Sequence, residues 1–333
     1  MKILVAPLNW GLGHASRCIP LIHRFLDEGH EVILGGDGDS LTLLRRHFPS
    51  LRYVCLAPLQ LRYGRRSRQV WPMLRALPRL IAWAVKDHLM LRALLHEERI
   101  DRVVSDNRFG LYNRSAECIY ITHQLHIFLP KGWRWAEGIA SRLHAHIYAR
   151  YDKVLVPDYE DFHHSLAGEL SHPTFTFDHS PFTFIGPLSR FANTNLSLQS
   201  TPPYDVVAVL SGLEPQRTML EQDLRKRFAD TQEKVLIIQG LVGRPNTRIR
   251  QANITIVPSM SDSELVAALL NAKRIIARSG YSTIMDLHAL DLLGRTEMIP
   301  TPGQPEQEYL AEFYRKCCTD KKKAVILQSK IER

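Results

Sequence analysis

The chain opens with residues 2–7, KILVAP, then the turn 9–14, NWGLGH, an apolar helical pattern that ends at Gly29, and residues 31–34, EVIL. The two short apolar segments are typical of strands that are buried on both faces of a parallel sheet. Between them, apolar residues recur at three- and four-residue steps, which predicts an amphipathic helix. A strand, a glycine turn, a helix and a second strand form a βαβ unit, whose crossover connection requires parallel strands.

The same alternation of strands and helices continues along the chain. Further short strands, separated by helical patterns, are expected at residues 102–105, 119–122, 153–156, 205–210, 235–238, 254–257, 274–277 and 298–299. The 333 residues fit two domains of ~150 residues each. We therefore predict an α/β protein of two Rossmann-like, doubly wound domains that face each other across a cleft, over residues 1–186 and 187–333. Ligands of such sheets bind beyond the carboxyl ends of the strands.

Composition excludes several classes of protein. Hydrophobic residues make up 45% and charged residues 23% of the chain, as in globular rather than disordered or fibrous proteins. Because no run of ~18 apolar residues is present, we expect no transmembrane helix, and the apolar N-terminal stretch is too short for a signal peptide. The five cysteines include no C-x-x-C pair and predict no disulfide framework, so we expect a cytoplasmic protein.

We expect no metal site and no other cofactor. The fifteen histidines include no H-E-x-x-H motif, and the pairs His123/His126 and His144/His146 lack a carboxylate or thiolate at ligand spacing. The triplet Asp37-Gly38-Asp39 matches a D-x-D metal motif. It follows the second expected strand, however, where Asp and Gly are favoured because they suit the backbone of a turn.

The positive charge of the chain, +9 overall, is concentrated between Arg62 and Leu95. This arm holds seven Arg and one Lys against one acid, together with Trp71 and Trp83, which are suited to a lipid headgroup region. On a helix, cations would share one face and apolar residues another: Arg68, Arg75, Arg79 and Lys86 against Leu74, Leu77, Ile81 and Val85. Such a helix is typical of a membrane interface, so we predict that Arg62–Leu95 binds an anionic membrane surface. The alternative is a core helix with a solvated basic face. No nucleic-acid-binding fold accompanies the arm, so no nucleic acid is expected.

Two stretches of the second half resemble a known enzyme family: residues 278–287, RSGYSTIMDL, and residues 299–310, IPTPGQPEQEYL. They are similar to the donor-binding half of the GT-B glycosyltransferases, especially the glycosyltransferase family 28-like family of the peptidoglycan lipid-II N-acetylglucosaminyltransferase. Residues 11–14, GLGH, resemble that family's acceptor-side loop, and residues 211–217, SGLEPQR, resemble its donor-side loop. The four motifs lie in register across most of the chain.

The resemblance implies a set of residues that bind the donor: Ser211, Gly212, Arg217, Ser279, Gly280, Thr283, Asp286, Gln304 and Gln307. Ser279 and Gly280 precede a helix that we expect to begin near Thr283, where free N–H groups and the helix dipole favour a diphosphate. Asp286 lies one turn into this helix and is implied to hold the nucleotide ribose. The two glutamines are implied to face the donor sugar.

Each of these donor-side residues also has a simpler explanation. Asp286 suits the first turn of any helix, because a carboxylate complements the dipole there. The glutamines bracket Glu306 at the opening of the next helix and suit its capping after Pro305. Arg217 suits a surface ion pair, and its neighbour Glu214 would repel a diphosphate.

On the acceptor side, the candidate catalytic residues are His14 and Asp106, beside the loop residues Gly11, Gly13 and His123. An acceptor hydroxyl needs a general base. His14 begins a helix, whose N-terminus favours the neutral imidazole that a base requires. Asp106 ends a strand and is the second candidate for the base, or else orients His14, and His123 ends the next strand at the same cleft. A capping or core role is the alternative for His14.

The resemblance implies an inverting glycosyltransferase that moves a sugar from a nucleotide-sugar to an acceptor hydroxyl. We expect a UDP-linked donor, a lipid-linked or membrane-proximal acceptor, and a location at the inner face of a membrane. Two other functions stay open. A nucleotide-sugar 2-epimerase shares the architecture but needs several carboxylates in the cleft, and a non-catalytic protein could have kept the fold only to bind a nucleotide-sugar.

Overall fold

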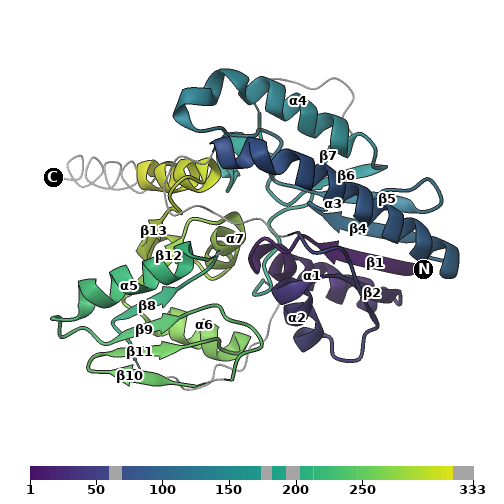
Figure 1. Ribbon diagram of the computed structural model, residues 1–333. Coiled ribbons are helices and arrows are strands. Elements are labelled where there is room, and N and C mark those ends of the chain that lie inside the picture. Colours follow the sequence, from purple (N-terminus) through teal and green to yellow (C-terminus); the bar gives the residue numbers. More distant parts are fainter. Residues whose placement is uncertain (60–69, 174–181, 193–202, 213, 246, 318–333) are drawn as a thin grey trace, which may run out of the picture.

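The computed structural model describes residues 1–333 except 60–69, 174–181, 193–202, 213, 246 and 318–333. It contains two domains, each built on a largely parallel sheet with helices on both faces. Figure 1 shows the first domain with α3 and α4 above its strands, and the second domain below and to its left. The predicted α/β architecture of two doubly wound domains is confirmed.

The first sheet contains seven parallel strands in the described residues, in the order β3-β2-β1-β4-β5-β6-β7. The strand order reverses between β1 and β4, which is the switch point where doubly wound sheets bind ligands. The strands are β1 (Lys2–Pro7), β2 (Glu31–Gly36), β3 (Tyr53–Cys55), β4 (Arg102–Asp106), β5 (Glu117–Ile121), β6 (Lys153–Val156) and β7 (Phe182–Phe184).

Helices cover both faces of this sheet because each of them buries an apolar stripe. α1 (Gly13–Asp27) and α2 (Gly38–His47) pack on one face, and α3 (Val70–Glu97) and α4 (Glu137–Tyr148) pack on the other. Short 3-10 helices complete the domain: η1 (Lys131–Ala136), η2 (Phe162–His164) and η3 (Gly168–Leu170).

The second sheet contains six strands in the part of the chain that the structure describes, in the order β10-β11-β9-β8-β12-β13. All neighbours are parallel except β10 and β11, and the order reverses between β8 and β12. The elements are β8 (Val206–Val209), α5 (Gln216–Phe228), β9 (Val235–Ile238), β10 (Ile249–Gln251), β11 (Ile254–Val257), α6 (Asp262–Asn271), β12 (Arg274–Arg278), α7 (Tyr281–Ala289), η4 (Leu293–Arg295) and β13 (Thr296–Ile299).

The two domains share a hydrophobic cluster. Leu166 of the first domain packs with Met285 of α7 and with Leu310, which belongs to the helical stretch 305–317. The Tyr309 hydroxyl of this stretch accepts a hydrogen bond from the backbone N–H of Glu169 at 2.9 Å. The proposed division after residue 186 therefore separates the two sheets, while the C-terminal stretch packs back onto the first domain.

Residues 70–95 of the basic arm lie in α3, and they correct one expectation. Trp83 is buried, and its indole N–H donates to the carbonyl of Ala57 at 2.9 Å. The expectation that Trp83 faces a lipid headgroup region is therefore wrong, because packing against Phe109 and this hydrogen bond hold it inside. The side chains of Arg68, Trp71, Leu74 and Arg75 lie outside the described residues. Among those described, no helix combines the length and the apolar character needed to cross a bilayer.

Candidate active site

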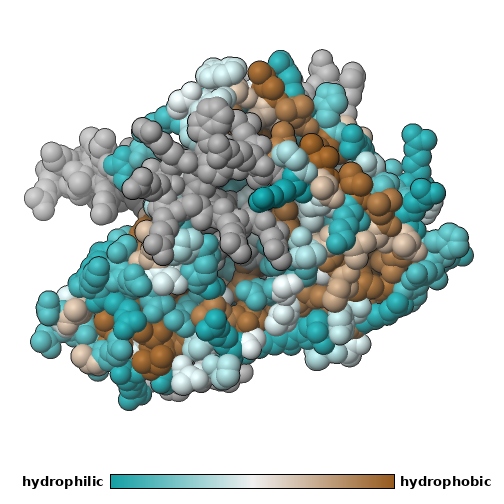
Figure 2. All heavy atoms as spheres, viewed as in Figure 1, coloured by the Kyte–Doolittle hydropathy of each residue, from teal (hydrophilic) through white to brown (hydrophobic). Residues whose placement is uncertain are grey.

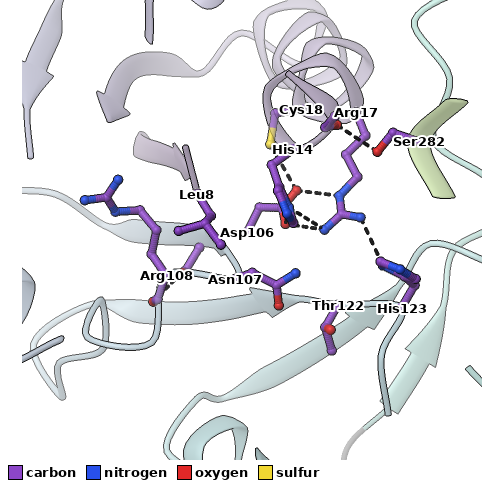
Figure 3. A network of polar contacts seen from close by, with 12 residues as sticks. Leu8, His14, Arg17, Cys18, Asp106, Asn107, Arg108, Thr122, His123 and Ser282 are labelled. Atoms are coloured by element: carbon purple, nitrogen blue, oxygen red, sulfur yellow. Dashed lines mark hydrogen bonds and ion pairs between the residues drawn. The ribbon is translucent and has the colours of Figure 1, made fainter. Parts of the chain in front are cut away.

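A cluster of polar side chains lies at the carboxyl end of the first sheet, beside the switch point (Figure 3). Asp106 ends β4 and is fully buried. Its Oδ2 accepts a hydrogen bond from Arg17 Nε at 2.5 Å, and its Oδ1 accepts one from Arg17 Nη2 and lies 2.8 Å from His14 Nδ1. His14 and Arg17 lie about one turn apart on α1, so one face of that helix brings both to the carboxylate.

The charges in this cluster compensate each other. Burial by itself would raise the pKa of Asp106, but the Arg17 guanidinium and the His14 contact outweigh burial and lower it. Burial would lower the pKa of Arg17, which is 1% exposed, but the Asp106 carboxylate outweighs burial and raises it. Asp106 is therefore ionised, and His14 Nδ1 lies between its Oδ1 and Arg17 Nη2, which is 3.0 Å away.

His123 extends the cluster to the second domain. Its Nδ1 lies 3.1 Å from Arg17 Nη1, and its Nε2 lies 2.8 Å from Glu306 Oε1. The imidazole also stacks on the ring of Tyr281 with 4.3 Å between centroids, and Gln124 donates to the second oxygen of Glu306. Burial lowers the pKa of His123 more than Glu306 raises it. Burial would raise the pKa of Glu306, but His123 outweighs burial and lowers it.

The N-termini of α1 and α7 meet at the interface between the domains. The Ser282 hydroxyl donates to the carbonyl of Gly13 at 2.9 Å, and a Cβ at Gly13 would lie 2.9 Å from that hydroxyl. α7 begins at Tyr281, two residues before the expected start at Thr283, and Gly280 occupies the N-cap position without a side-chain hydrogen bond. The first N–H groups and the dipoles of two helices therefore favour an anion here.

Asp286 lies on α7, and its carboxylate contacts the connection between the sheets. The Ser189 hydroxyl donates to Asp286 Oδ1 at 2.7 Å, and Arg190 Nε lies 3.6 Å from Oδ2. Arg190 also pairs with Asp262 at the start of α6 at 3.0 Å. Burial raises the pKa of Asp286 more than Arg190 lowers it. The carboxylate thus binds two residues of the connection between the domains, Ser189 and Arg190.

The predicted glutamines lie where the helical stretch 305–317 begins. Gln307 Oε1 accepts from the backbone N–H of Thr301 at 2.9 Å, and the backbone carbonyl of Gln307 accepts from the Ser279 hydroxyl at 2.7 Å. The backbone N–H of Gln304 donates to the Thr301 carbonyl at 3.1 Å. These contacts agree with the capping alternative, since they close the turn before the helix.

The two predicted glycine loops line one cavity of about 220 Å³ between the domains. Gly11 comes from the acceptor side, and Ser211, Gly212 and Arg217 come from the donor side. Gly11 and Gly212 have φ values of +81° and +97°, and a Cβ at Gly11 would lie 3.7 Å from Gly212 Cα. Arg217 Nη2 donates to Glu214 Oε1 at 2.7 Å, so the charge of this arginine is compensated within its own loop.

The triplet Asp37-Gly38-Asp39 has a structural partner. Asp37 Oδ1 accepts from Arg108 Nη1 at 2.8 Å, and Arg108 is fully buried and also pairs with Asp87 of α3 at 2.9 Å. Asp37 thus compensates a buried guanidinium. No group of three or more His, Cys, Asp or Glu residues that could hold a metal ion occurs within the described ranges. Independence of metal stays a prediction.

Three members of the cluster are missing from the sequence-based set: Arg17, Gln124 and Glu306. The spacing of three residues from His14 could have indicated Arg17, because such residues share a helix face. Glu306, in contrast, contacts His123 across a separation of 183 residues, and no local pattern reports a contact of that kind.

Two curated proteins of Methanosarcina acetivorans, both described as uncharacterized glycosyltransferases, are similar to this chain. One is 28% identical over 181 residues, which cover 48% of this chain and 42% of that protein. The other is 23% identical over 340 residues, which cover 92% of this chain and 82% of that protein. The match thus spans less than half of the first relative. No protein-family profile matches the chain.

Solved glycosyltransferase structures share the fold. The glycotransferase of kitacinnamycin has a TM-score of 0.57 at 18% identity, covering 95% of this chain and 84% of its own. An Arabidopsis thaliana protein complexed with UDP-L-rhamnose has a TM-score of 0.54 at 13% identity, covering 99% and 93%. The spinosyn rhamnosyltransferase complexed with thymidine diphosphate has a TM-score of 0.55 at 12% identity, covering 96% and 90%. The predicted GT-B fold is confirmed, and the relatives and neighbours belong to the expected enzyme class.

Proposed function

We propose that this chain is an inverting glycosyltransferase that moves a sugar from a nucleotide-sugar to an acceptor hydroxyl. One observation carries the proposal: the His14–Asp106 contact lies at the switch point of the first sheet, next to the N-terminus of α7. The proximity of a candidate base to a candidate anion site supports the proposal. The similarity to glycosyltransferases supports the proposal, and two neighbours were solved with a nucleotide-sugar or a nucleoside diphosphate.

In this mechanism His14 is the general base. When the ionised Asp106 accepts a hydrogen bond from Nδ1, the ring nitrogen Nε2 is left to take the proton of the acceptor hydroxyl. Asp106 then stabilises the imidazolium that forms, as the carboxylate of a catalytic triad does. Arg17 keeps Asp106 ionised, so the carboxylate orients His14 and does not itself take the proton.

The remaining steps concern the donor. The acceptor oxygen bonds to the anomeric carbon as the bond to the diphosphate breaks on the opposite face, so the configuration inverts. We propose that the departing diphosphate binds at the start of α7, near Ser279, Gly280 and Thr283, because N–H groups and two helix dipoles stabilise the developing charge. Ser211, Gly212 and Arg217 would contact the donor from the opposite loop, Asp286 would bind the ribose, and Gln304 and Gln307 would face the sugar.

The finer identity of the substrates is also a proposal. We propose a UDP-linked donor and a lipid-linked or membrane-proximal acceptor, as the resemblance to the family 28-like glycosyltransferases implies. This acceptor would place the enzyme at the inner face of a membrane. The exposed apolar residues of α3 support a location of this kind.

The test is a panel of UDP- and TDP-linked sugars incubated with the full chain, with and without a hydroxyl-bearing lipid acceptor. Release of nucleoside diphosphate that depends on the acceptor is the expected result. Conversion of the sugar without diphosphate release would instead identify a 2-epimerase. Saturable binding of the nucleotide-sugar with neither reaction would contradict the proposal and favour a non-catalytic binding protein.

A further inference from the structure

We propose that the outer face of α3, η1 and α4 docks on the surface of an anionic lipid bilayer. This docking face consists of Leu77, Ile81, Val85 and Leu89 of α3 with Trp135, Ile139 and Leu143 of the neighbouring segment, flanked by cationic side chains. The role of this face, to bring the enzyme to a membrane-proximal acceptor, rests on the proposed function. The surface itself follows from exposure, spacing and charge.

The part on α3 is a row of exposed apolar side chains spaced four residues apart. Leu77, Ile81, Val85 and Leu89 are 51%, 58%, 54% and 57% exposed, although each is a large hydrophobic residue. Residues four apart lie on the same side of a helix, so the row runs along one face for about 18 Å. The opposite face of α3 packs against the domain, where Trp83 and Leu91 are buried. The helix therefore already contributes one face to the core, and the exposed row is a second apolar face.

A second apolar group continues the face. Trp135 of η1 is 73% exposed, and Ile139 and Leu143 of α4 are 53% and 64% exposed. α3 and α4 cover the same side of the first sheet, since Leu94 and Tyr148 belong to one buried cluster. Their outer faces therefore open toward the same side of the molecule. Figure 2 shows hydrophobic residues along the upper right of the surface, where α3 and α4 lie in Figure 1.

The charge around the face indicates which partner it fits. Six exposed cations flank the apolar residues: Arg79, Lys86 and Arg92 on α3, and Lys131, Arg134 and Arg142 on η1 and α4. None of the six forms an ion pair within the described part of the chain. Asp87, the acid in the middle of α3, is buried against Arg108. Apolar side chains flanked by Lys and Arg match a bilayer interface with anionic headgroups. A second copy of the same face would instead bring like charges together.

The position of the docking face suits an acceptor that arrives from a membrane. The inner side of α3 holds Arg108 through Asp87 at 2.9 Å, and Arg108 follows Asp106 by two residues. Arg108 also reaches Asp37 at the start of α2. One helix diameter, about 10 Å, thus separates the docking face from the loop that follows the candidate catalytic carboxylate at the end of β4.

The experiment is co-sedimentation of the full chain with vesicles of neutral phosphatidylcholine, with or without anionic phosphatidylglycerol, at low and high salt. An apolar variant, Ile81→Ser/Val85→Ser/Leu89→Ser, is compared with Met219→Ser/Ile249→Ser, which removes exposed apolar residues of the second domain. A charge variant, Arg79→Gln/Lys86→Gln/Arg92→Gln, is compared with Lys226→Gln/Arg250→Gln. Circular dichroism and calorimetric binding of UDP show whether each variant retains its fold and its nucleotide site.

We expect the wild-type chain to bind only the anionic vesicles, and more weakly at high salt. The apolar variant should bind at least tenfold more weakly, and the charge variant about fivefold more weakly for each cation removed. The two control variants should bind like the wild type. Absence of binding by the wild type, equal binding by the apolar variant, or a dimer that the apolar variant converts to a monomer would each overturn the proposal. UDP binding is measured without vesicles. A wild-type chain that binds anionic vesicles but not UDP would therefore count against the proposed function and not against the docking face.

Discussion

The carboxyl ends of the two sheets are built from different groups. At the first sheet, the buried Arg17 side chain contacts the buried Asp106 and His123, and both Arg17 and Asp106 contact His14. At the second sheet, the facing groups are glycine turns, the uncapped start of α7, and the pair Arg217–Glu214, whose glutamate side chain is 50% exposed. At the first edge buried ionised side chains thus contact one another, whereas the second edge faces the cavity between the domains with glycine turns and lies beside the backbone N–H groups that begin α7.

The two edges are therefore suited to different roles, proton transfer at the first and anion binding at the second. Buried, paired charges hold a proton-transferring group in one orientation, because breaking any contact leaves an uncompensated charge. Backbone N–H groups and a helix dipole bind an anion of any identity without a titrating group. We therefore expect mutations at the first edge to affect stability and turnover, and mutations at the second to affect mainly nucleotide affinity.

Removing the carboxylate of the first edge should have the largest effect. Asp106→Ala leaves the buried Arg17 guanidinium without its counter-charge, and we expect a loss of about 3–5 kcal/mol in the free energy of unfolding. Glu214→Ala breaks the exposed pair of the second edge and should cost at most about 1 kcal/mol. Urea unfolding of both variants measures the difference. Similar losses in the two variants would contradict the contrast between the edges.

Removal of the proposed base should affect turnover and not nucleotide affinity. We expect His14→Ala to lower turnover by about 10²–10⁴ with little change in UDP affinity, because general-base catalysis acts in the transition state. The measurements are nucleoside diphosphate release and calorimetry. His163→Ala removes an exposed histidine and serves as the control. Full turnover of His14→Ala would transfer the role of base to Asp106 or His123.

The donor edge is tested at Asp286. If this carboxylate binds the ribose, Asp286→Ala should weaken UDP binding about tenfold to a hundredfold, equivalent to about 1.5–3 kcal/mol for hydrogen bonds to a charged group. Ser189→Ala removes the hydrogen bond to Asp286 while keeping the carboxylate, and it should retain UDP affinity. Unchanged affinity of Asp286→Ala in calorimetry would restrict this residue to the interdomain connection.

The smallest expected effect is a pH dependence of stability at the contact between the two edges. The pKa of Glu306 is lowered in the folded chain, so the folded state binds fewer protons than the unfolded state as the pH falls below about 4.3. The stabilisation by Glu306 is present above that pH and is lost as the pH falls through the folded pKa. Burial also lowers the pKa of His123. The stabilisation that depends on its neutral ring is therefore likewise lost as the pH falls below about 6.5.

Urea midpoints measured between pH 7 and pH 3 test this dependence. Glu306→Gln should reduce the loss of stability on the acidic side, because the variant has no carboxylate to protonate. Glu160→Gln, which removes an exposed carboxylate of the first domain, is the control. An unchanged acidic slope in Glu306→Gln would mean that the contact between His123 and Glu306 contributes nothing to stability.

The local patterns of the chain predict the elements well and the side-chain partners poorly. The expected strand 102–105 is β4 with one more residue, and the turn after KILVAP leads directly into α1. The arm from Arg62 to Leu95 is helical in its described part, yet Trp83 faces inward and the row from Leu77 to Leu89 faces outward. Periodicity identifies two faces of a helix, but which of them meets the sheet depends on the neighbours it finds there.

The sequence by itself therefore determined the two βαβ-based domains, the glycine loops, and the presence of His14, Asp106 and His123 at strand or helix ends. These features depend on hydrophobic periodicity and turn chemistry, which act over a few residues. Only the tertiary structure decided that Arg17 shares Asp106 with His14, that Glu306 pairs with His123, and that Asp286 contacts Ser189. Such contacts join residues far apart in the chain, and only the packing of helices and domains fixes their distances.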